Sequence, residues 1–92
     1  MKIKVNFHGV FSEVFKKAEI EVKLKESANI ETLLKLLCDS DESRHNIFDQ
    51  HGEIRPTVII FRNGRHVDSL GGGQTILSEG DQVAILQMTS GG

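Results

Sequence analysis

The chain has 92 residues, of which 38% are hydrophobic and 26% are charged, and its formal net charge is −2. This length allows one small domain with a single hydrophobic core. A slightly acidic balance argues against nucleic acid or an anionic membrane surface as a partner.

Nothing in the sequence directs the chain out of the cytoplasm. The first residues alternate like a strand and do not have the composition of a secretory signal. No apolar run approaches the roughly 18 residues of a membrane-spanning helix. The single cysteine, Cys38, cannot form an internal disulfide. We therefore expect a cytoplasmic protein.

The first part of the chain predicts two strands. Residues 2–8 alternate strictly between apolar and polar side chains, and residues 18–25 alternate in the same way. Two alternating strands this close together predict an antiparallel hairpin. Residues 10–17, between them, are rich in apolar side chains. We expect this segment to be a connection that folds back over one end of the core.

The middle of the chain changes to a helical period. Apolar residues at helical spacing from Ile30 to Cys38 predict an amphipathic helix, and Asn29 is a suitable N-cap. Cys38 falls on the packed face of this helix, where we expect it to act as a small apolar residue. The alternative is a transient role in accepting sulfur or a thioester. Residues 39–43 are expected to form an exposed connection, followed by a short helical turn within residues 44–50.

The second half predicts further strands. Residues 57–61 are apolar on both faces, which is typical of an interior strand. Asn63-Gly64 is a strong signal for a hairpin turn, and we expect a short strand at residues 66–68 after it. Residues 83–86 predict the last strand of the sheet.

The final residues offer no apolar side chain for burial. We expect residues 1–88 to form the folded domain and residues 89–92 to form a flexible tail that ends in Gly91 and Gly92. Glycine lacks a Cβ atom and therefore passes through narrow channels. A tail of this kind can present the α-carboxylate of Gly92 to the active site of another protein.

Residues 77–84 read Leu-Ser-Glu-Gly-Asp-Gln-Val-Ala, and the sequence ends on Gly91 and Gly92. This pattern resembles the sulfur-carrier branch of the ubiquitin-like proteins, which includes the molybdopterin synthase small subunit, the thiamine-pathway sulfur carrier and the archaeal small modifier proteins. Gln87 and Met88 stand where molybdopterin synthase small subunits usually carry two prolines. The resemblance implies an α+β fold of the β-grasp type. One main helix would pack across a mixed sheet whose first and last strands lie parallel at its centre.

The same resemblance implies a carrier and not an enzyme. An E1-like activating enzyme would adenylate the Gly92 carboxylate, and sulfur would convert it to a thiocarboxylate for molybdopterin, thiamine or tRNA thiolation. The partner would supply ATP and Mg²⁺, the chain itself would bind no cofactor, and a synthase subunit would accept the sulfur. Two alternatives remain open. One is a protein modifier that is joined through Gly92 to lysines of target proteins, and the other is an interaction module whose glycines are incidental.

Strand alternation predicts a second site, on the face of the sheet that the helix does not cover. Leu86 and Met88 of the last strand would point away from the helix, beside Ile59 and Phe61 of the neighbouring strand. An outward patch of these four side chains would be apolar enough to mark a partner surface.

Other polar clusters are not expected to be sites. His8, His45, His51 and His66 lack the spacing of zinc ligands, so no metal site is predicted. The glycine run at residues 71–73 lacks the Gly-Lys-Ser/Thr ending of a phosphate loop and indicates a wide turn.

Overall fold

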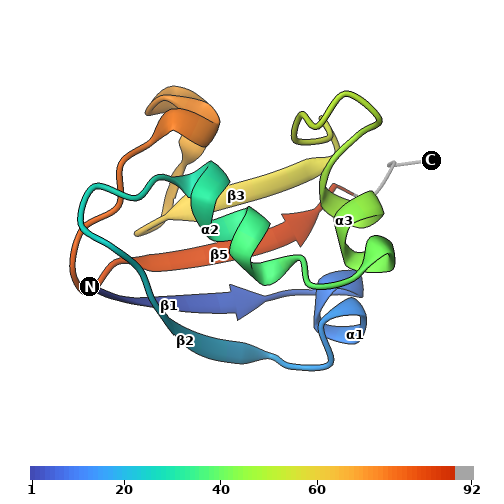
Figure 1. The fold of residues 1–92 in the computed structure, drawn as a ribbon, viewed down its shortest axis with the longest axis horizontal. Helices are drawn as coiled ribbons and strands as arrows, with labels where there is room; N and C mark the ends of the chain where they lie inside the picture. The colour runs from blue at the N-terminus through green and yellow to red at the C-terminus, as the bar shows by residue number, and fades with distance from the viewer. Residues whose placement is uncertain (89–92) are drawn as a thin grey trace.

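A computed structural model of the chain describes residues 1–88, so the predicted tail at residues 89–92 lies outside the described residues. Five strands form one mixed sheet in the order β2-β1-β5-β3-β4 (Figure 1). The strands are β1 (Lys2–Phe7), β2 (Glu19–Lys23), β3 (Val58–Arg62), β4 (Arg65–His66) and β5 (Gln82–Gln87).

The first and last strands lie side by side at the centre of the sheet. β1 runs parallel to β5, with Val5 opposite Val83 and Phe7 opposite Ile85. β2 pairs antiparallel with β1 on one side, and β3 pairs antiparallel with β5 on the other. The predicted mixed sheet and the predicted N-terminal hairpin are both confirmed.

Helix α2 (Ile30–Leu37) lies across one face of the sheet (Figure 1). The side chain of Asn29 accepts a hydrogen bond of 2.8 Å from the backbone N–H of Thr32, which satisfies one unpaired donor of the first turn, as the sequence predicted. Apolar side chains of α2 and of the sheet face beneath it form the core. The members that are entirely inaccessible to solvent include Ile3, Val5, Ile30, Leu33, Leu34, Val83 and Ile85.

The expected connection after the first strand contains a short helix, α1 (Val10–Val14). Phe11 is fully buried, and the ring of Phe15 stacks on that of Phe7 with centroids 4.5 Å apart. The segment therefore covers one end of the core as expected. Its apolar residues 11, 14 and 15 follow the helical spacing i, i+3, i+4, which is the signal that a connection lacks.

The exposed connection that we expected at residues 39–43 is limited to Asp39 and Ser40. Helix α3 (Asp41–Ile47) begins directly after them, and Ser40 is its N-cap. The Ser40 hydroxyl accepts from the Ser43 N–H at 3.1 Å, and the Ser43 hydroxyl accepts from the Ser40 N–H at 3.2 Å. This reciprocal pair forms a capping box with serine in place of the usual Glu or Gln. The helix ends where Ile47 and Phe48 enter the core, as the sequence predicted.

The predicted hairpin turn after β3 is confirmed, whereas the strand after it is shorter than expected. Asn63 and Gly64 have φ values of 50° and 83°, which is the left-handed pair that a tight hairpin requires. β4 then spans only Arg65–His66, and a 3₁₀ turn at Val67–Ser69 replaces the rest of the expected strand. Val67 turns into the core there, which ends the pairing with β3.

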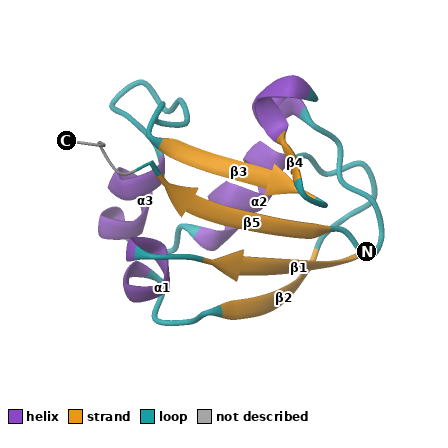
Figure 2. Ribbon diagram, turned by 180° about the vertical axis from the view of Figure 1, so that it is seen from behind, coloured by secondary structure: helices purple, strands orange, loops and turns teal. Residues whose placement is uncertain are grey.

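The opposite face of the sheet carries no helix within residues 1–88, as the view from behind shows (Figure 2). Of the helices described in that range, none has the length and apolar character needed to cross a membrane.

Candidate functional site

The apolar part of the uncovered face lies on β3 and β5. Ile59 sits directly opposite Leu86, and Phe61 sits directly opposite Ala84. Met88 follows the end of β5 and is 53% exposed. We refer to Ile59, Phe61, Leu86 and Met88 as the outward patch. The structure therefore brings together the side chains that the sequence predicted to share this face.

The residues that alternate with the patch residues on β3 and β5 point into the core. Val83 and Ile85 are fully buried, and Val58 and Ile60 are 8% and 2% exposed. Because successive side chains of a strand point to opposite faces, this burial fixes the outward direction of the patch residues. The predicted strand register is confirmed.

Two shallow hollows flank Leu86 on this face. One, of about 630 Å³, lies beside Met88 and is lined by His8, Gly9, Val10 and Thr57 as well. The other, of about 580 Å³, lies between Leu86 and Phe61. The ring of His66 packs edge-on against the ring of Phe61, with centroids 5.5 Å apart. This contact fixes the position of the Phe61 ring at the border of the second hollow. A partner side chain inserted beside Leu86 would contact apolar surface on both sides.

The uncovered face changes character toward β1 and β2. Asn6 of β1 pairs with Ala84 of β5. On the other side of β1, Lys4 pairs with Glu21 of β2 and Lys2 pairs with Lys23 of β2. One half of the face is therefore apolar and the other half is charged. Partner-binding surfaces usually have an apolar centre with polar residues at its rim, and here the charged half borders the apolar half on one side.

The path of the chain at the end of β5 is fixed by the backbone. The N–H of Met88 donates a hydrogen bond of 2.7 Å to the carbonyl of Thr57. The last described residue is therefore held against the start of β3, at the edge of the outward patch. Gly91 and Gly92, the predicted reacting end, lie outside the described residues.

A buried carboxylate connects the end of β3 to the start of β5. Asp81 accepts hydrogen bonds from Arg62 Nε at 2.7 Å, from Asn63 Nδ2 at 2.9 Å and from the backbone N–H of Ser78 at 2.8 Å. The Asn63 side chain in turn accepts from the N–H of Gln82 at 2.9 Å. Burial raises the pKa of Asp81, but these hydrogen bonds and the Arg62 charge outweigh it, so the pKa lies below its ordinary value.

Sequence reasoning missed this network. The signal for it was present as two turn motifs, Asn63-Gly64 and Gly80-Asp81, placed at the same end of neighbouring strands. An arginine at the inward position of β3 was the further sign, because an inward arginine needs a partner.

The other ionisable groups do not form a reactive cluster. Cys38 is 4% exposed, and burial raises the pKa of its thiol to about 11. Its Sγ donates to the carbonyl of Ser43 at 3.6 Å. Within residues 1–88, no three His, Cys, Asp or Glu side chains lie close enough together to hold a metal ion.

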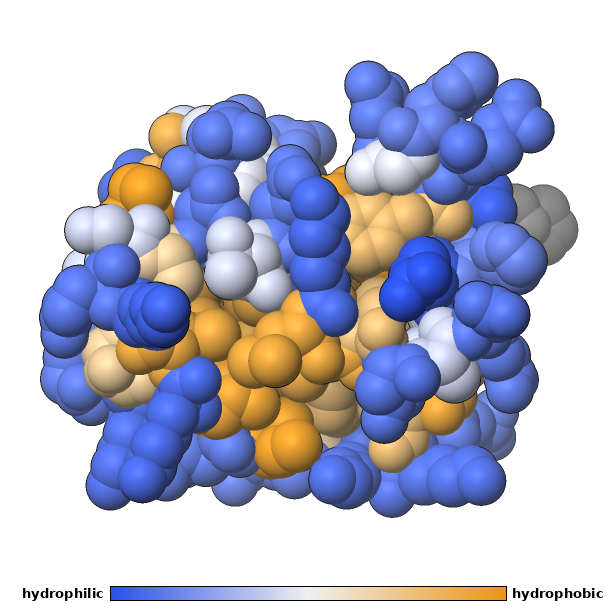
Figure 3. Space-filling model, in the orientation of Figure 1, coloured by the Kyte–Doolittle hydropathy of each residue, from blue (hydrophilic) through white to orange (hydrophobic). Residues whose placement is uncertain are grey.

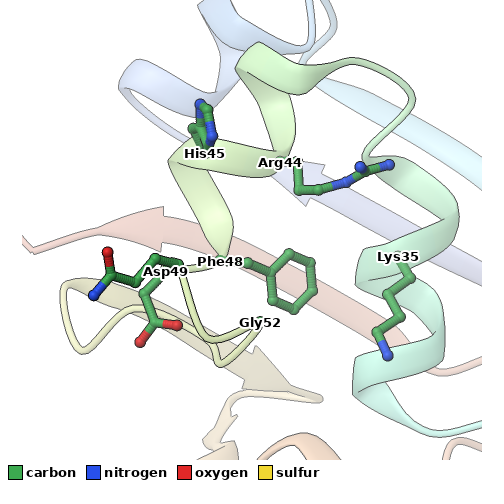
Figure 4. A pocket seen from close by; sticks show the side chains of 7 residues that line it. Lys35, Arg44, His45, Phe48, Asp49 and Gly52 are labelled. Carbon is green, nitrogen blue, oxygen red and sulfur yellow. The ribbon is translucent and has the colours of Figure 1, made fainter.

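A separate pocket of about 510 Å³ lies between α2, α3 and the loop that follows α3 (Figure 4). The Phe48 ring points from the loop toward α2, near Lys35 and Arg44. Backbone N–H groups of Glu53 and His51 bind the Asp49 carboxylate and lower its pKa. The lining residues of the described chain include no serine, threonine or cysteine nucleophile. We assign no reaction to this pocket.

The fold is that of the ubiquitin-like β-grasp proteins. The crystal structure of SAMP1 from Haloferax volcanii superposes with a TM-score of 0.87 at 19% identity and covers 100% of both chains. The solution structure of Urm1 from Trypanosoma brucei has a TM-score of 0.81 at 26% identity, over 99% of this chain and 95% of that chain.

Sequence comparison identifies the family. The ThiS family matches residues 5–92. Small archaeal modifier protein 3 of Haloferax volcanii is 28% identical over 92 residues, which is 100% of each chain. The chain therefore belongs to the ThiS family of ubiquitin-like sulfur carriers. Its relatives are small carrier and modifier proteins and not catalytic enzymes, in agreement with the expectation from the sequence.

Proposed function

We propose that the chain is a sulfur carrier whose Gly92 carboxylate is adenylated by an E1-like activating enzyme and then converted to a thiocarboxylate. The observation that carries this proposal is the family match, which runs through residue 92 and so includes Gly91 and Gly92. The delivered sulfur would serve molybdopterin, thiamine or tRNA thiolation, with a synthase subunit as acceptor in the first two cases. The site of action would be the cytoplasm.

The chemistry needs activation because a free carboxylate has no good leaving group. Transfer of AMP from ATP to a Gly92 oxygen releases pyrophosphate and creates that leaving group. The terminal sulfur of a donor persulfide then attacks the carbonyl carbon, and AMP leaves. A thiol cleaves the resulting S–S bond, is itself oxidised to a disulfide, and leaves the thiocarboxylate on Gly92. We propose that the activating partner supplies ATP and Mg²⁺ and that the chain itself binds no cofactor.

The outward patch would dock the activating enzyme. Ile59, Phe61 and Leu86 lie on a rigid pair of strands, and Met88 lies where the chain leaves the sheet. Residues 89–92 span at most about 14 Å when fully extended. An enzyme that binds the patch must therefore hold its nucleotide within about that distance of Met88.

A second candidate function is protein modification. It is favoured by the match to Small archaeal modifier protein 3 along the full length of both chains. In that case a lysine amine of a target protein, and not sulfur, would displace AMP from Gly92. Both functions use the same activated Gly92 carboxylate, whereas an interaction module with incidental glycines would not use this carboxylate.

The test is the intact mass of the protein purified from its own cells, compared with a variant that lacks Gly92. A sulfur carrier shows a species in which one oxygen is replaced by sulfur, and the variant does not. A modifier shows covalent adducts with other proteins that also disappear in the variant. A wild-type protein that shows neither the sulfur-containing terminus nor adducts with other proteins, in cells that contain the activating enzyme, would contradict both.

A further inference from the structure

β2 is an outer strand of the sheet, and within residues 1–88 its outer edge is paired with no other strand. On its inner side, the β2 segment bonds to the β1 segment through the backbone groups of alternate residues. Leu24 and Met1 exchange hydrogen bonds of 2.8 and 2.7 Å, and the Phe7 N–H donates to the Ala18 carbonyl. In an antiparallel pair such residues alternate with residues whose N–H and C=O groups point away. The backbone groups of Glu19, Glu21 and Lys23 therefore point to the open edge.

A groove whose lining includes apolar side chains of β2 and α2 runs along this edge on the helical face. Ile20, Val22 and Leu24 of the β2 segment are only partly buried, and Leu36 of α2 is 55% exposed. Figure 3 shows apolar surface gathered between the end of α2 and β2. A cavity of about 510 Å³ lies here, between α2, α1, β2 and the start of α3, and its lining also includes the charged side chains of Lys16, Lys17, Asp39 and Glu42. β2 is therefore unpaired along its outer edge and only partly covered on its apolar side.

The charges along the edge are divided into an acidic half and a basic half. Glu19 and Glu21 come first, and Lys23 and Lys25 follow. All four are exposed. Glu19, Glu21 and Lys23 share the face of the sheet that carries no helix, and Lys25 lies two residues beyond the end of β2. A strand with this pattern is complementary to a copy of itself that runs in the opposite direction.

We propose that β2 pairs antiparallel with β2 of a second copy of this chain, about a two-fold axis at Val22. Glu21 then lies opposite Lys23 of the second copy and exchanges backbone hydrogen bonds with it, and Glu19 lies opposite Lys25. Lys23 already has Lys2 as its neighbour on β1, so a carboxylate on its open side offsets that repulsion.

The apolar side of the strand fits the same register. Val22 meets its own copy at the axis, and Ile20 meets Leu24 of the second copy. The two grooves join beneath the two α2 helices, so each Leu36 loses solvent exposure. Registers shifted by two residues place either Glu21 or Lys23 against itself at the axis, which is unfavourable. The charge pattern therefore selects one register.

This pairing leaves the proposed function undisturbed. The outward patch lies on β3 and β5, and β1 separates those strands from the β2 edge. A continuous sheet of two copies would expose both patches on one face. The dimer proposal can therefore be tested independently of the chemistry proposed for Gly92.

The first test is the mass of the full chain by light scattering from about 10 μM to about 1 mM, the range expected for a small interface. Glu21→Lys and Lys23→Glu each create like-charge pairs across the axis and should weaken dimerisation by about tenfold or more. The double variant restores opposite charges and should dimerise like the wild type. An equimolar mixture of the two single variants should form a heterodimer.

Asp68→Lys makes the same charge change as Glu21→Lys beyond β4, at the opposite edge of the sheet, and should dimerise normally. Thermal melts of each variant verify that it is folded. A wild type that stays monomeric to about 1 mM would overturn the proposal and point to a strand of another protein, or to none. Single variants that dimerise as well as the wild type would overturn it too.

A second test reads the register directly. Val22→Cys brings two thiols together at the axis in a closely spaced pair, so mild oxidation should give a disulfide-linked dimer. Ile20→Cys places its thiols about 13 Å apart along the strands and should not cross-link. The wild type, which has only the buried Cys38, is the control. Cross-linking of Ile20→Cys in preference to Val22→Cys would contradict the assigned register.

Discussion

The Nε atom of Arg62 lies 2.7 Å from Oδ2 of Asp81, which joins the end of β3 to the turn before β5. Arg62 is the last inward residue of β3, opposite Val83, and its side chain is 26% exposed. The ion pair allows a charged side chain to follow Val58 and Ile60 on the core side of the strand. Phe61 and Ile59 are thereby held in their outward orientation.

Loss of the Asp81 charge should destabilise the protein. Asp81→Asn removes the carboxylate that binds Arg62, Asn63 and the Ser78 N–H, and we expect a loss of about 2–4 kcal/mol in the free energy of unfolding. The measurement is urea denaturation. The matched control is Asp68→Asn, whose side chain is 81% exposed and whose change should be below about 0.5 kcal/mol. Equal changes in the two variants would show that the network does not stabilise the fold.

The contribution of Asp81 should depend on pH in a defined direction. Its pKa in the folded protein lies below the ordinary value of 3.8. The stabilisation is therefore fully present above that value and is lost as the pH falls through it toward the folded-state pKa. The difference in unfolding free energy between wild type and Asp81→Asn should shrink from about pH 6 to about pH 3. A difference that is constant over this range would contradict the assignment.

The fold was largely predictable because its strands alternate and its turns carry diagnostic residues. Asn29 before the run from Ile30 located α2, and Asn63-Gly64 located the β3–β4 turn. α3 was misplaced because its capping box uses Ser43, a residue that also suits a loop. α1 was missed because its helix is only 5 residues long, so the segment carries a single i, i+3, i+4 set of apolar residues and not a repeated pattern.

Opposite faces of β5 should respond differently to a charge. Ile85→Asp buries an unpaired carboxylate in a position that has no solvent exposure, and we expect the domain to unfold. Leu86→Asp places the charge on the uncovered face and should cost only about 1–2 kcal/mol. Thermal melts of the two variants provide the comparison.

Leu86→Asp should also weaken binding to the activating enzyme by about tenfold or more, because the outward patch would then carry a charge at its centre. Gln74→Asp, at an exposed position in the 3₁₀ turn Gly72–Gln74 beside α2, makes the same charge change away from this face, so it is the matched control and should bind nearly as well as the wild type. Calorimetric titration measures both. Unchanged binding of Leu86→Asp would remove the patch from the proposed interface.

Cys38 should be unreactive in the folded protein. Burial raises the pKa of its thiol from 9.0 to about 11. At pH 8 the thiolate fraction is therefore about 100-fold smaller than for an ordinary cysteine, and access is restricted as well. An aromatic disulfide reagent should react slowly with the native protein and rapidly in urea. Rapid reaction without denaturant would indicate an exposed thiol that serves in sulfur transfer.

The two parts of the candidate site differ in how far the sequence could predict them. The outward patch followed from alternation alone, because one buried face fixes the other. The hollow beside Met88 could not be predicted, since it depends on His8, Gly9 and Val10 at the start of α1 and on Thr57, which are distant from Met88 in sequence. The role of Gly92 is a chemical proposal that rests on family membership and not on geometry.

The most direct test of that role is ATP–pyrophosphate exchange with the cognate activating enzyme. Three proteins are compared: the wild type, a variant that lacks Gly92, and a variant with one alanine added after Gly92. The added residue moves the carboxylate about 3.3–3.6 Å along an extended chain, whereas attack on ATP requires reacting atoms within about 3–3.5 Å. We predict exchange with the wild type only, and unchanged thermal melts for all three. Equal exchange by the three proteins would contradict the account, because the Gly92 carboxylate would then not be the reacting group.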